Sequence, residues 1–247
     1  MREGDILKNV SKIEKSWILY DWANSAYSLA ITTTILPLYF KMVFKQTGGS
    51  AALSTAYWGY ANSVATLLVA VLAPILGTMA DYKGYKMKFF KVFFIFGVAF
   101  TACLSLIPYD YWLLLLIIFI ISCIGFSGCN VFYDAFLVDI TTEDRMDRIS
   151  SMGFGYGYIG STIPFIISMA MVILAQYNKI PMPISLACKI SFIITAVWWA
   201  VFTLPMIKNV KQIYGIEVQK NPIKNTFQRL GNTIKNVSSN NSLFLLY

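Results

Sequence analysis

Six long apolar runs occupy most of this 247-residue chain, and they constrain its fold more than any other feature. Each run reaches the roughly 17–25 residues that a helix needs to cross about 30 Å of hydrocarbon. With 57% hydrophobic and 13% charged residues, the composition argues against a soluble domain. The sequence therefore predicts an all-α, multi-pass integral membrane protein. Its six-transmembrane-helix bundle is expected to cover residues 17–206, with spans at 17–40, 56–80, 89–107, 111–138, 153–176 and 187–206.

The basic residues lie mostly on alternate sides of these runs and predict their orientation. The N-terminal tail (1–16), the loops after runs two and four, and the segment after run six hold 16 of the 20 Lys and Arg residues. Cytoplasmic loops carry such an excess of positive charge. We therefore expect the tail and the basic linker at 207–242 to be cytoplasmic. The net charge of +8 then reports topology and contact with anionic membrane lipid, and we expect no binding to nucleic acid.

The residue types that are missing from the chain exclude most enzyme chemistry. There is no histidine, which is the commonest general base and the commonest metal ligand. The four cysteines are scattered through predicted spans and indicate neither a disulfide framework nor a zinc site. We therefore expect no enzymatic activity, no bound metal and no cofactor.

The sequence turns apolar again after the basic linker. Residues 243–247 read Leu-Phe-Leu-Leu-Tyr, and five residues are too few to cross a bilayer. One interpretation is a hydrophobic C-terminal tip. The interpretation that we favour is the start of a truncated seventh span, in a protein about twice as long.

Two of the runs carry polar stripes. Asp21, Asn24 and Ser28 recur at helical spacing in run one, and Asn130 and Asp134 do so in run four. Polar side chains inside a bilayer normally face a bundle interior or a watery cavity, which makes these five residues candidates for a substrate path. For Asn24, Ser28 and Asn130 the alternative is hydrogen bonding between helices, and the pattern does not decide between the two.

The two carboxylates of these stripes are expected at similar depth in the cytoplasmic half of the membrane. No Lys or Arg falls within a predicted span at that level, except near span ends. A carboxylate without a cationic partner in this setting is a candidate carrier of a coupling proton. The alternative is that Asp21 interacts with the positive end of its helix and that Asp134 reaches the water among the lipid headgroups.

Run five is rich in glycine. Its segment GYGYIG matches the dinucleotide fingerprint G-x-G-x-x-G formally, but no strand precedes it and it opens a membrane span. Small residues on one helix face let a neighbouring helix approach closely. We therefore interpret Gly153, Gly157 and Gly160 as helix-packing residues.

The loop after run two, GTMADYKGYKMK at 77–88, resembles a signature of the major facilitator superfamily, G-x-L-A-D-[RK]-x-G-[RK]-[RK]. It departs from that signature at Met79, Tyr82 and Tyr85. Three further segments are more specific, namely YDWANSAY at 20–27, FYDAFLVDI at 132–140 and RISSMGFGYGYIG at 148–160. Together they resemble the vacuole effluxer branch of the superfamily, which comprises the autophagy-related amino-acid exporters and their bacterial relatives.

This resemblance implies that the chain is the N-terminal half of a twelve-helix fold, in which each six-helix bundle contains inverted three-helix repeats. It implies secondary active transport of a small polar solute such as an amino acid, by alternating access, with a C-terminal six-helix half as partner. It also implies a conformational latch of Gly77, Asp81, Lys83 and Gly84, with Asp139 as its partner in the fourth span. The Lys- and Asn-rich, histidine-free composition favours a prokaryotic plasma membrane over a vacuole.

A six-span scaffold or assembly subunit without transport activity is the alternative function. The glycine-rich fifth run would then be the partner surface. The basic linker at 207–242 would contact lipid or another protein.

Overall fold

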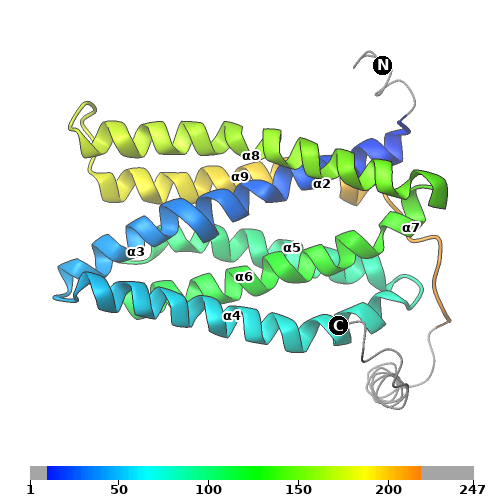
Figure 1. The fold of residues 1–247 in the computed structure, drawn as a ribbon, viewed down its shortest axis with the longest axis horizontal. Coiled ribbons are helices and arrows are strands. Elements are labelled where there is room, and N and C mark those ends of the chain that lie inside the picture. Colours follow the sequence, from blue (N-terminus) through cyan, green and yellow to red (C-terminus); the bar gives the residue numbers. More distant parts are fainter. Residues whose placement is uncertain (1–9, 218–247) are drawn as a thin grey trace, which may run out of the picture.

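The computed structural model describes residues 10–217 of the chain. Within this part, six helical segments are long and apolar enough to cross a membrane, which confirms the predicted six-helix membrane bundle (Figure 1). They run over Lys12–Gln46, Ala51–Ala80, Tyr85–Leu106, Trp112–Ala135, Glu143–Gln176 and Ile184–Asn209. The predicted seventh span at 243–247 lies outside the described residues, as does most of the basic linker.

The first span is built from three consecutive pieces. Helix α2 (Lys12–Tyr27) begins with a capping box, in which the Ser11 side chain accepts from the Glu14 amide and the Glu14 carboxylate accepts from the Ser11 amide. A π-helical stretch, η1 (Ser28–Thr34), follows, and α3 (Ile35–Gln46) completes the span. A π-helical turn widens a helix locally and is frequent at functional sites, and no sequence signal had predicted it.

The remaining spans follow the apolar runs with local changes at their ends. Helix α4 (Ala51–Ala80) is capped by Ser50, and α5 (Tyr85–Cys103) begins after Gly84, whose φ of 77° a residue with a side chain rarely adopts. The 3₁₀ turn η2 (Leu104–Leu106) ends this span. The fourth apolar run does not form one helix to residue 138, because α6 (Trp112–Ala135) ends before the buried Phe136. The elements that follow are α7 (Leu137–Ile140), η3 (Glu143–Arg145), α8 (Met146–Gln176) and α9 (Ile184–Asn209).

The helices pack in two matching sets. Helix α2 packs mainly against α8 and α9, whereas α6 packs mainly against α4 and α5. The first helix of each three-helix set therefore contacts the second and third helices of the other set. Figure 1 shows the result as two layers, with α2, α8 and α9 in one and α4, α5 and α6 in the other. This exchange is the arrangement expected of inverted three-helix repeats.

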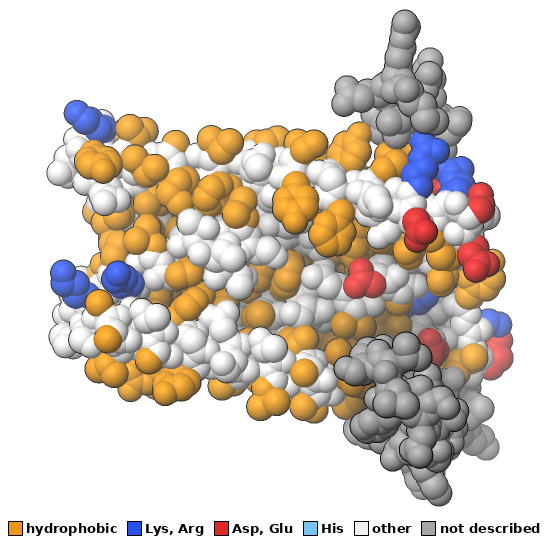
Figure 2. Space-filling model, in the orientation of Figure 1, with side chains coloured by type: hydrophobic (Ala, Val, Ile, Leu, Met, Phe, Trp, Pro, Cys, Tyr) orange, Lys and Arg blue, Asp and Glu red, His pale blue; other side chains and the backbone are white. Residues whose placement is uncertain are grey.

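The outer surface of the bundle is apolar between two polar ends. Hydrophobic side chains cover the flank in Figure 2, and Lys and Arg are confined to the two ends. Large exposed hydrophobic residues occur on all six spans, among them Ile13, Leu67, Ile95, Leu113, Ile166 and Val197. Such a surface is stable in lipid, which surrounds it with hydrocarbon instead of water.

Four connections gather at one end of the bundle. They are the start of α2, the α4–α5 turn, the α6–α8 connection and the segment after α9 (Figure 1). The α3–α4 and α8–α9 loops lie at the opposite end. The grouping agrees with the alternation of basic loops along the sequence.

The glycine face of α8 lies directly against α2. A Cβ atom added at Gly157 would lie 3.2 Å from the backbone oxygen of Asp21 and would collide with the Ser25 hydroxyl. An added Cβ at Gly160 would collide with Trp22, and one at Gly153 would touch Trp17. All three glycines therefore lie where α2 makes its closest approach.

We predict that Gly157→Ala destabilises the bundle and that Gly155→Ala does not. The added methyl group at position 157 would force α2 and α8 apart, and overpacking of this kind costs about 1–3 kcal/mol. Gly155 provides a matched control, because it is in the same helix and nothing lies within 4 Å of its added Cβ. Thermal unfolding of the purified variants in detergent would measure the difference. Equal melting temperatures would contradict close packing at Gly157.

Candidate functional site

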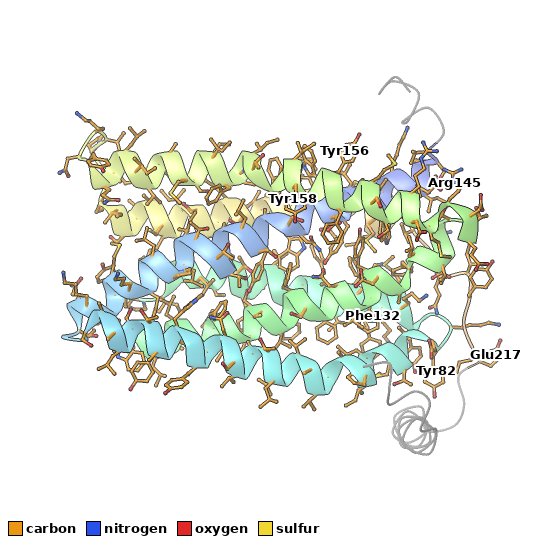
Figure 3. All side chains as sticks on the ribbon, viewed as in Figure 1. Tyr82, Phe132, Arg145, Tyr156, Tyr158 and Glu217 are labelled. Atoms are coloured by element: carbon orange, nitrogen blue, oxygen red, sulfur yellow. The ribbon has the colours of Figure 1, made fainter. Side chains whose placement is uncertain are left out.

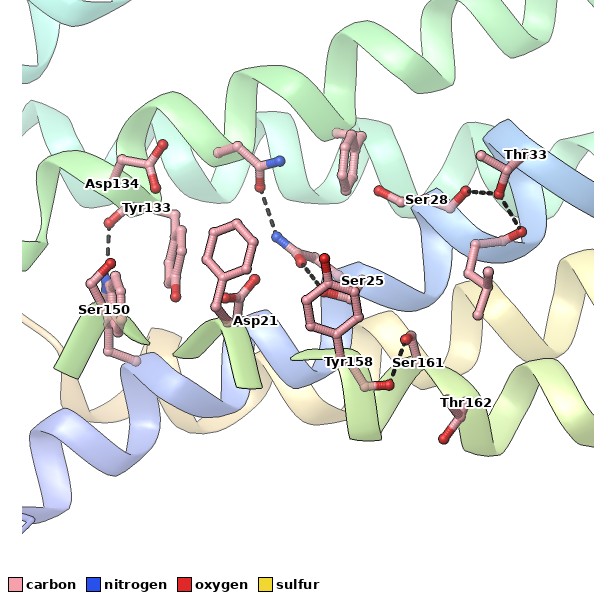
Figure 4. Close-up of a pocket in the computed structure, with 16 residues that line it drawn as sticks. Asp21, Ser25, Ser28, Thr33, Tyr133, Asp134, Ser150, Tyr158, Ser161 and Thr162 are labelled. Atoms are coloured by element: carbon pink, nitrogen blue, oxygen red, sulfur yellow. Dashed lines mark hydrogen bonds between the residues drawn. The ribbon is translucent and has the colours of Figure 1, made fainter. Parts of the chain in front are cut away.

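A cavity of about 720 Å³ opens between α2, η1, α6 and α8 (Figure 4). All five predicted path residues line it. Helix α2 supplies Asp21 and Asn24, η1 supplies Ser28, and α6 supplies Asn130 and Asp134. The two stripes that the sequence placed on separate helices thus face one space.

Helix α8 provides a third wall that the sequence analysis missed. Its lining residues are Ser150, Phe154, Tyr158, Ser161 and Thr162. Their spacing of four, four and three or four residues is that of one helix face, so the same periodicity that identified the other stripes could have found them. We had interpreted this run only as a packing helix because of its glycines, which occupy the neighbouring face.

Two asparagines join the walls across the cavity. The Asn24 amide donates to the Asn130 Oδ1 atom at 2.7 Å, and the Tyr20 hydroxyl donates to the same oxygen at 3.2 Å. Asn24 and Asn130 line the cavity and also link the first span to the fourth.

An aromatic cluster closes one side of the cavity. Trp17 stacks on Tyr133 with ring centroids 4.2 Å apart, and its indole N–H donates to the Tyr133 carbonyl at 3.0 Å. Tyr20 packs on the other side, with its ring centroid 4.6 Å from that of Tyr133. The Tyr133 hydroxyl is buried, and no described residue is its hydrogen-bond partner.

The two carboxylates of the cavity have no partner of opposite charge. Asp21 is half-buried and Asp134 is exposed, and both line the cavity. Neither forms a hydrogen bond or an ion pair with another residue of 10–217, and no Lys or Arg of this part lines the cavity. Because Glu14 occupies the first turn of α2, Asp21 is not the residue at the positive end of that helix.

A second cluster of charges lies at the end of the bundle where the four connections gather. The Asp139 carboxylate pairs with Lys86 at 2.6 Å, and both side chains are almost completely buried. Its other oxygen accepts from the backbone amides of Ile213 and Tyr214, each at 2.8 Å. Lys86 also donates to the Ala135 carbonyl at 2.7 Å. This cluster therefore joins the start of α5, the end of α6 and the segment after α9.

The structure places the predicted latch residues in several different contacts. Asp139 lies in the short α7, outside the fourth span, and its ion-pair partner is Lys86, the last base of the signature loop, which the sequence analysis had not selected. Lys83 instead forms an exposed ion pair with Glu217. Gly77 has open space around it, and Gly84 makes the turn.

The segment at 210–217, here called the tail segment, binds along the α4–α5 turn. The Ile216 amide donates to the Asp81 carbonyl at 2.8 Å, and the Lys83 amide donates to the Ile216 carbonyl at 3.0 Å. The Gln212 side chain accepts from the Gly84 amide and donates to the Tyr82 carbonyl. Tyr82 forms an isolated parallel β-bridge with Ile216, and Figure 3 labels Tyr82 and Glu217 at this end of the bundle.

Glu14 holds the start of α2 to the α6–α8 connection. Its carboxylate accepts from Arg145 at 3.0 Å and from the Thr141 hydroxyl at 2.7 Å, in addition to the Ser11 amide. Glu14 and Asp139 are therefore separate acidic residues that each link elements at the charged end of the bundle.

Comparisons with known proteins identify a family for this chain. The model of the family described as "Vacuole effluxer Atg22 like" matches residues 10–145 and 138–247. The chain is 55% identical over 240 residues to a Bacillus subtilis protein described as "Uncharacterized MFS-type transporter YxiO", an alignment that covers 97% of this chain and 56% of that protein. It is 25% identical over 169 residues to an uncharacterized Aquifex aeolicus protein, covering 67% of this chain and 39% of the other. The chain thus spans about half the length of the curated relatives that it matches. No solved structure matches it significantly.

We predict that Asp139→Ala strongly destabilises the protein. Removing one partner of a buried ion pair leaves an uncompensated charge, at a cost of about 3–5 kcal/mol. Lys83→Ala is the control, because its ion pair with Glu217 is exposed and such pairs contribute only about 0–1 kcal/mol. Thermal unfolding in detergent should separate the two variants by many degrees. A native-like melting temperature for Asp139→Ala would show that this cluster does not hold the end of the bundle together.

Proposed function

The chain belongs to the vacuole effluxer Atg22-like family of the major facilitator superfamily, and from this membership we propose that it forms one six-helix half of a secondary active transporter. The observation that carries the proposal is the cavity. Its volume of about 720 Å³ lies within the roughly 300–1,000 Å³ typical of small-molecule sites, and polar side chains of three spans line it. A scaffold needs no such space between its helices.

The placement of the cavity supports alternating access. Asp21 and Ser28 come from the first three-helix set, whereas Asn130, Asp134 and Tyr158 come from the second. A relative movement of the two sets would change every distance across the cavity. Sites at the boundary between repeats are those that rocking movements expose alternately to the two sides of the membrane.

A second six-helix half is part of this proposal. The relatives are longer than this chain, and the fold that the family implies has two bundles. The cavity then forms half of a central site, and a C-terminal bundle covers it. We propose a small polar solute such as an amino acid as the cargo, since the family description concerns effluxers and the resemblance implies amino-acid export.

A coupling proton is proposed at the two carboxylates. Asp21 and Asp134 face one cavity without a cationic partner, and the charge of one acts on the other. A proton bound there would remove one of two like charges, and its release would restore it. Binding of the solute and of the proton would in this way be linked at one place.

We predict that a pH gradient drives accumulation of solute through these two carboxylates. The protein for this test is a fusion in which this chain replaces the matching 240-residue part of the Bacillus subtilis relative. Proteoliposomes with the fusion should accumulate a member of a labelled amino-acid panel when a pH gradient is imposed. The Asp21→Asn/Asp134→Asn variant should lose the accumulation driven by the gradient.

The control and the contradicting outcome for this test are specific. Asp110→Asn removes a carboxylate from an exposed loop at the other end of the bundle, so it should transport like the unmodified fusion. Equal, gradient-independent fluxes in all three proteins would contradict the coupling role. Absence of any flux above that of protein-free liposomes, across the whole panel, would contradict transport of these solutes.

We further propose that the protein lies in a prokaryotic plasma membrane with its N-terminus in the cytoplasm. The charge alternation along the sequence supports this orientation. The gathering of the basic α4–α5 turn and the segment after α9 at one end of the bundle also supports it.

We predict that Lys83→Cys and Lys208→Cys react from the cytoplasmic side and Lys45→Cys from the outside. All three positions are exposed, and Lys45 lies in the last turn of α3 at the opposite end. A membrane-impermeant maleimide applied to intact cells, in a background without the native cysteines, would label only the variant at position 45. Labelling of both positions 83 and 208 in intact cells would contradict the proposed orientation, and labelling of only one of them would contradict the proposed topology.

A further inference from the structure

The charges that face the cavity are of one sign. Its titratable side chains are Asp21 of α2, Tyr133 and Asp134 of α6, and Tyr158 of α8. Helices α8 and α9 pack against α2, yet they add no Lys or Arg to the cavity lining within the described part of the chain. A cavity with two carboxylates and low-dielectric walls attracts cations and repels anions.

A buried hydroxyl marks where a ligand can bind. Tyr133 is only 5% exposed, and its hydroxyl has no hydrogen-bond partner among the described residues. A Cβ atom built on Gly153 would lie 3.2 Å from this hydroxyl and 3.2 Å from the Asp21 Oδ2 atom, so the two groups converge on the same point. A buried hydroxyl without a hydrogen bond is costly, and an N–H group that approached both oxygens from the cavity could donate to them.

Aromatic side chains form part of the cavity wall. Trp17 stacks on Tyr133, and Phe126, Phe154 and Tyr158 also line the cavity. The face of an aromatic ring attracts a cation, and a compact ammonium group fits between such faces. Two carboxylates, an unpaired hydroxyl and aromatic faces form the set of groups that recognises a protonated amine.

We propose that this cavity binds an organic cation, with its protonated amine held between Asp21, Asp134 and the Tyr133 hydroxyl. The inference rests on the proposed transport function and narrows its substrate class from small polar solutes to amines with a net positive charge. A dicarboxylate or a neutral polyol lacks the group that these side chains bind. The aromatic walls accommodate the carbon chain of the cation.

Binding to the purified full chain in detergent tests this proposal. The probes are 1,5-diaminopentane, 1,5-pentanediol and glutarate, which have the same five-carbon length and differ only in their end groups. Isothermal titration calorimetry should show saturable binding of the diamine and none of the diol or the dicarboxylate. Binding of the diol as tight as that of the diamine, or no binding of the diamine, would overturn the proposal.

Three variants assign the binding to the cavity. Asp21→Asn/Asp134→Asn should weaken binding of the diamine about tenfold or more, because hydrogen bonds to charged groups are the strong ones. Tyr133→Phe keeps the ring and should weaken binding several-fold, whereas Asp110→Asn should leave it unchanged. Thermal unfolding of each variant verifies that it is folded. Unweakened binding in the folded double variant, or equal competition by the same concentration of potassium chloride, would overturn the proposed site.

The failure of this inference differs from a failure of the proposed function. If the diamine does not bind while the fusion with the Bacillus subtilis relative still transports an amino acid, the cation site is wrong and transport stands. If the diamine binds and no flux is measured, the cation site stands and transport is contradicted.

Discussion

Hydrocarbon supplies no hydrogen bonds, and this constraint orders the whole bundle. Most polar side chains in the spans find a hydrogen-bond partner within the protein. The Thr101 and Ser122 hydroxyls pair at 2.8 Å, for example, and the Asn24 amide donates to Asn130. The exceptions are informative. Asp21 and the Tyr133 hydroxyl stay unpaired, and both face one cavity. The buried N–H or hydroxyl groups of Trp22, Tyr39, Ser168 and Trp199 also lack a partner among the described residues, but none of them lines this cavity. Asp21 and Tyr133 are thus unpaired groups that a solute in the cavity can meet.

The charged end of the bundle links parts that are distant in sequence. The buried Lys86–Asp139 pair also holds the tail segment through two backbone amides, while Gln212 bonds the α4–α5 turn. Because a buried charge cannot lose its partner cheaply, these elements must move together or exchange partners together. Glu14 joins the start of α2 to Arg145 of the next connection in the same way. A movement between the two three-helix sets therefore has to rearrange the contacts of Asp139 and Glu14.

Features that depend on periodicity and length could be predicted from the sequence. Apolar run lengths predicted the six spans, and the spacing of Asp21, Asn24 and Asn130 predicted residues that now line one cavity. Which lysine pairs with Asp139 could not be predicted in this way. Lys83 and Lys86 lie in the same basic loop, and only the packing of the helices buries Lys86 beside Asp139. The π-helical stretch and the break at 136 likewise have no counterpart in the lengths of the apolar runs or the spacing of polar residues.

In α8, the glycine that packs against α2 also lies beside polar groups of the cavity. A residue larger than glycine at position 153 would meet Trp17, the Asp21 carboxylate and the Tyr133 hydroxyl together, and these are the groups that converge on the cavity. The close approach of α2 to α8 therefore brings the carboxylate beside the hydroxyl. Helix association in a membrane depends on such close backbone contact, because lipid gives no hydrophobic drive between helices. It follows that a small separation of α2 from α8 would loosen the bundle and disperse the polar groups of the site in the same movement, so that occupancy of the cavity and the position of α8 must depend on each other.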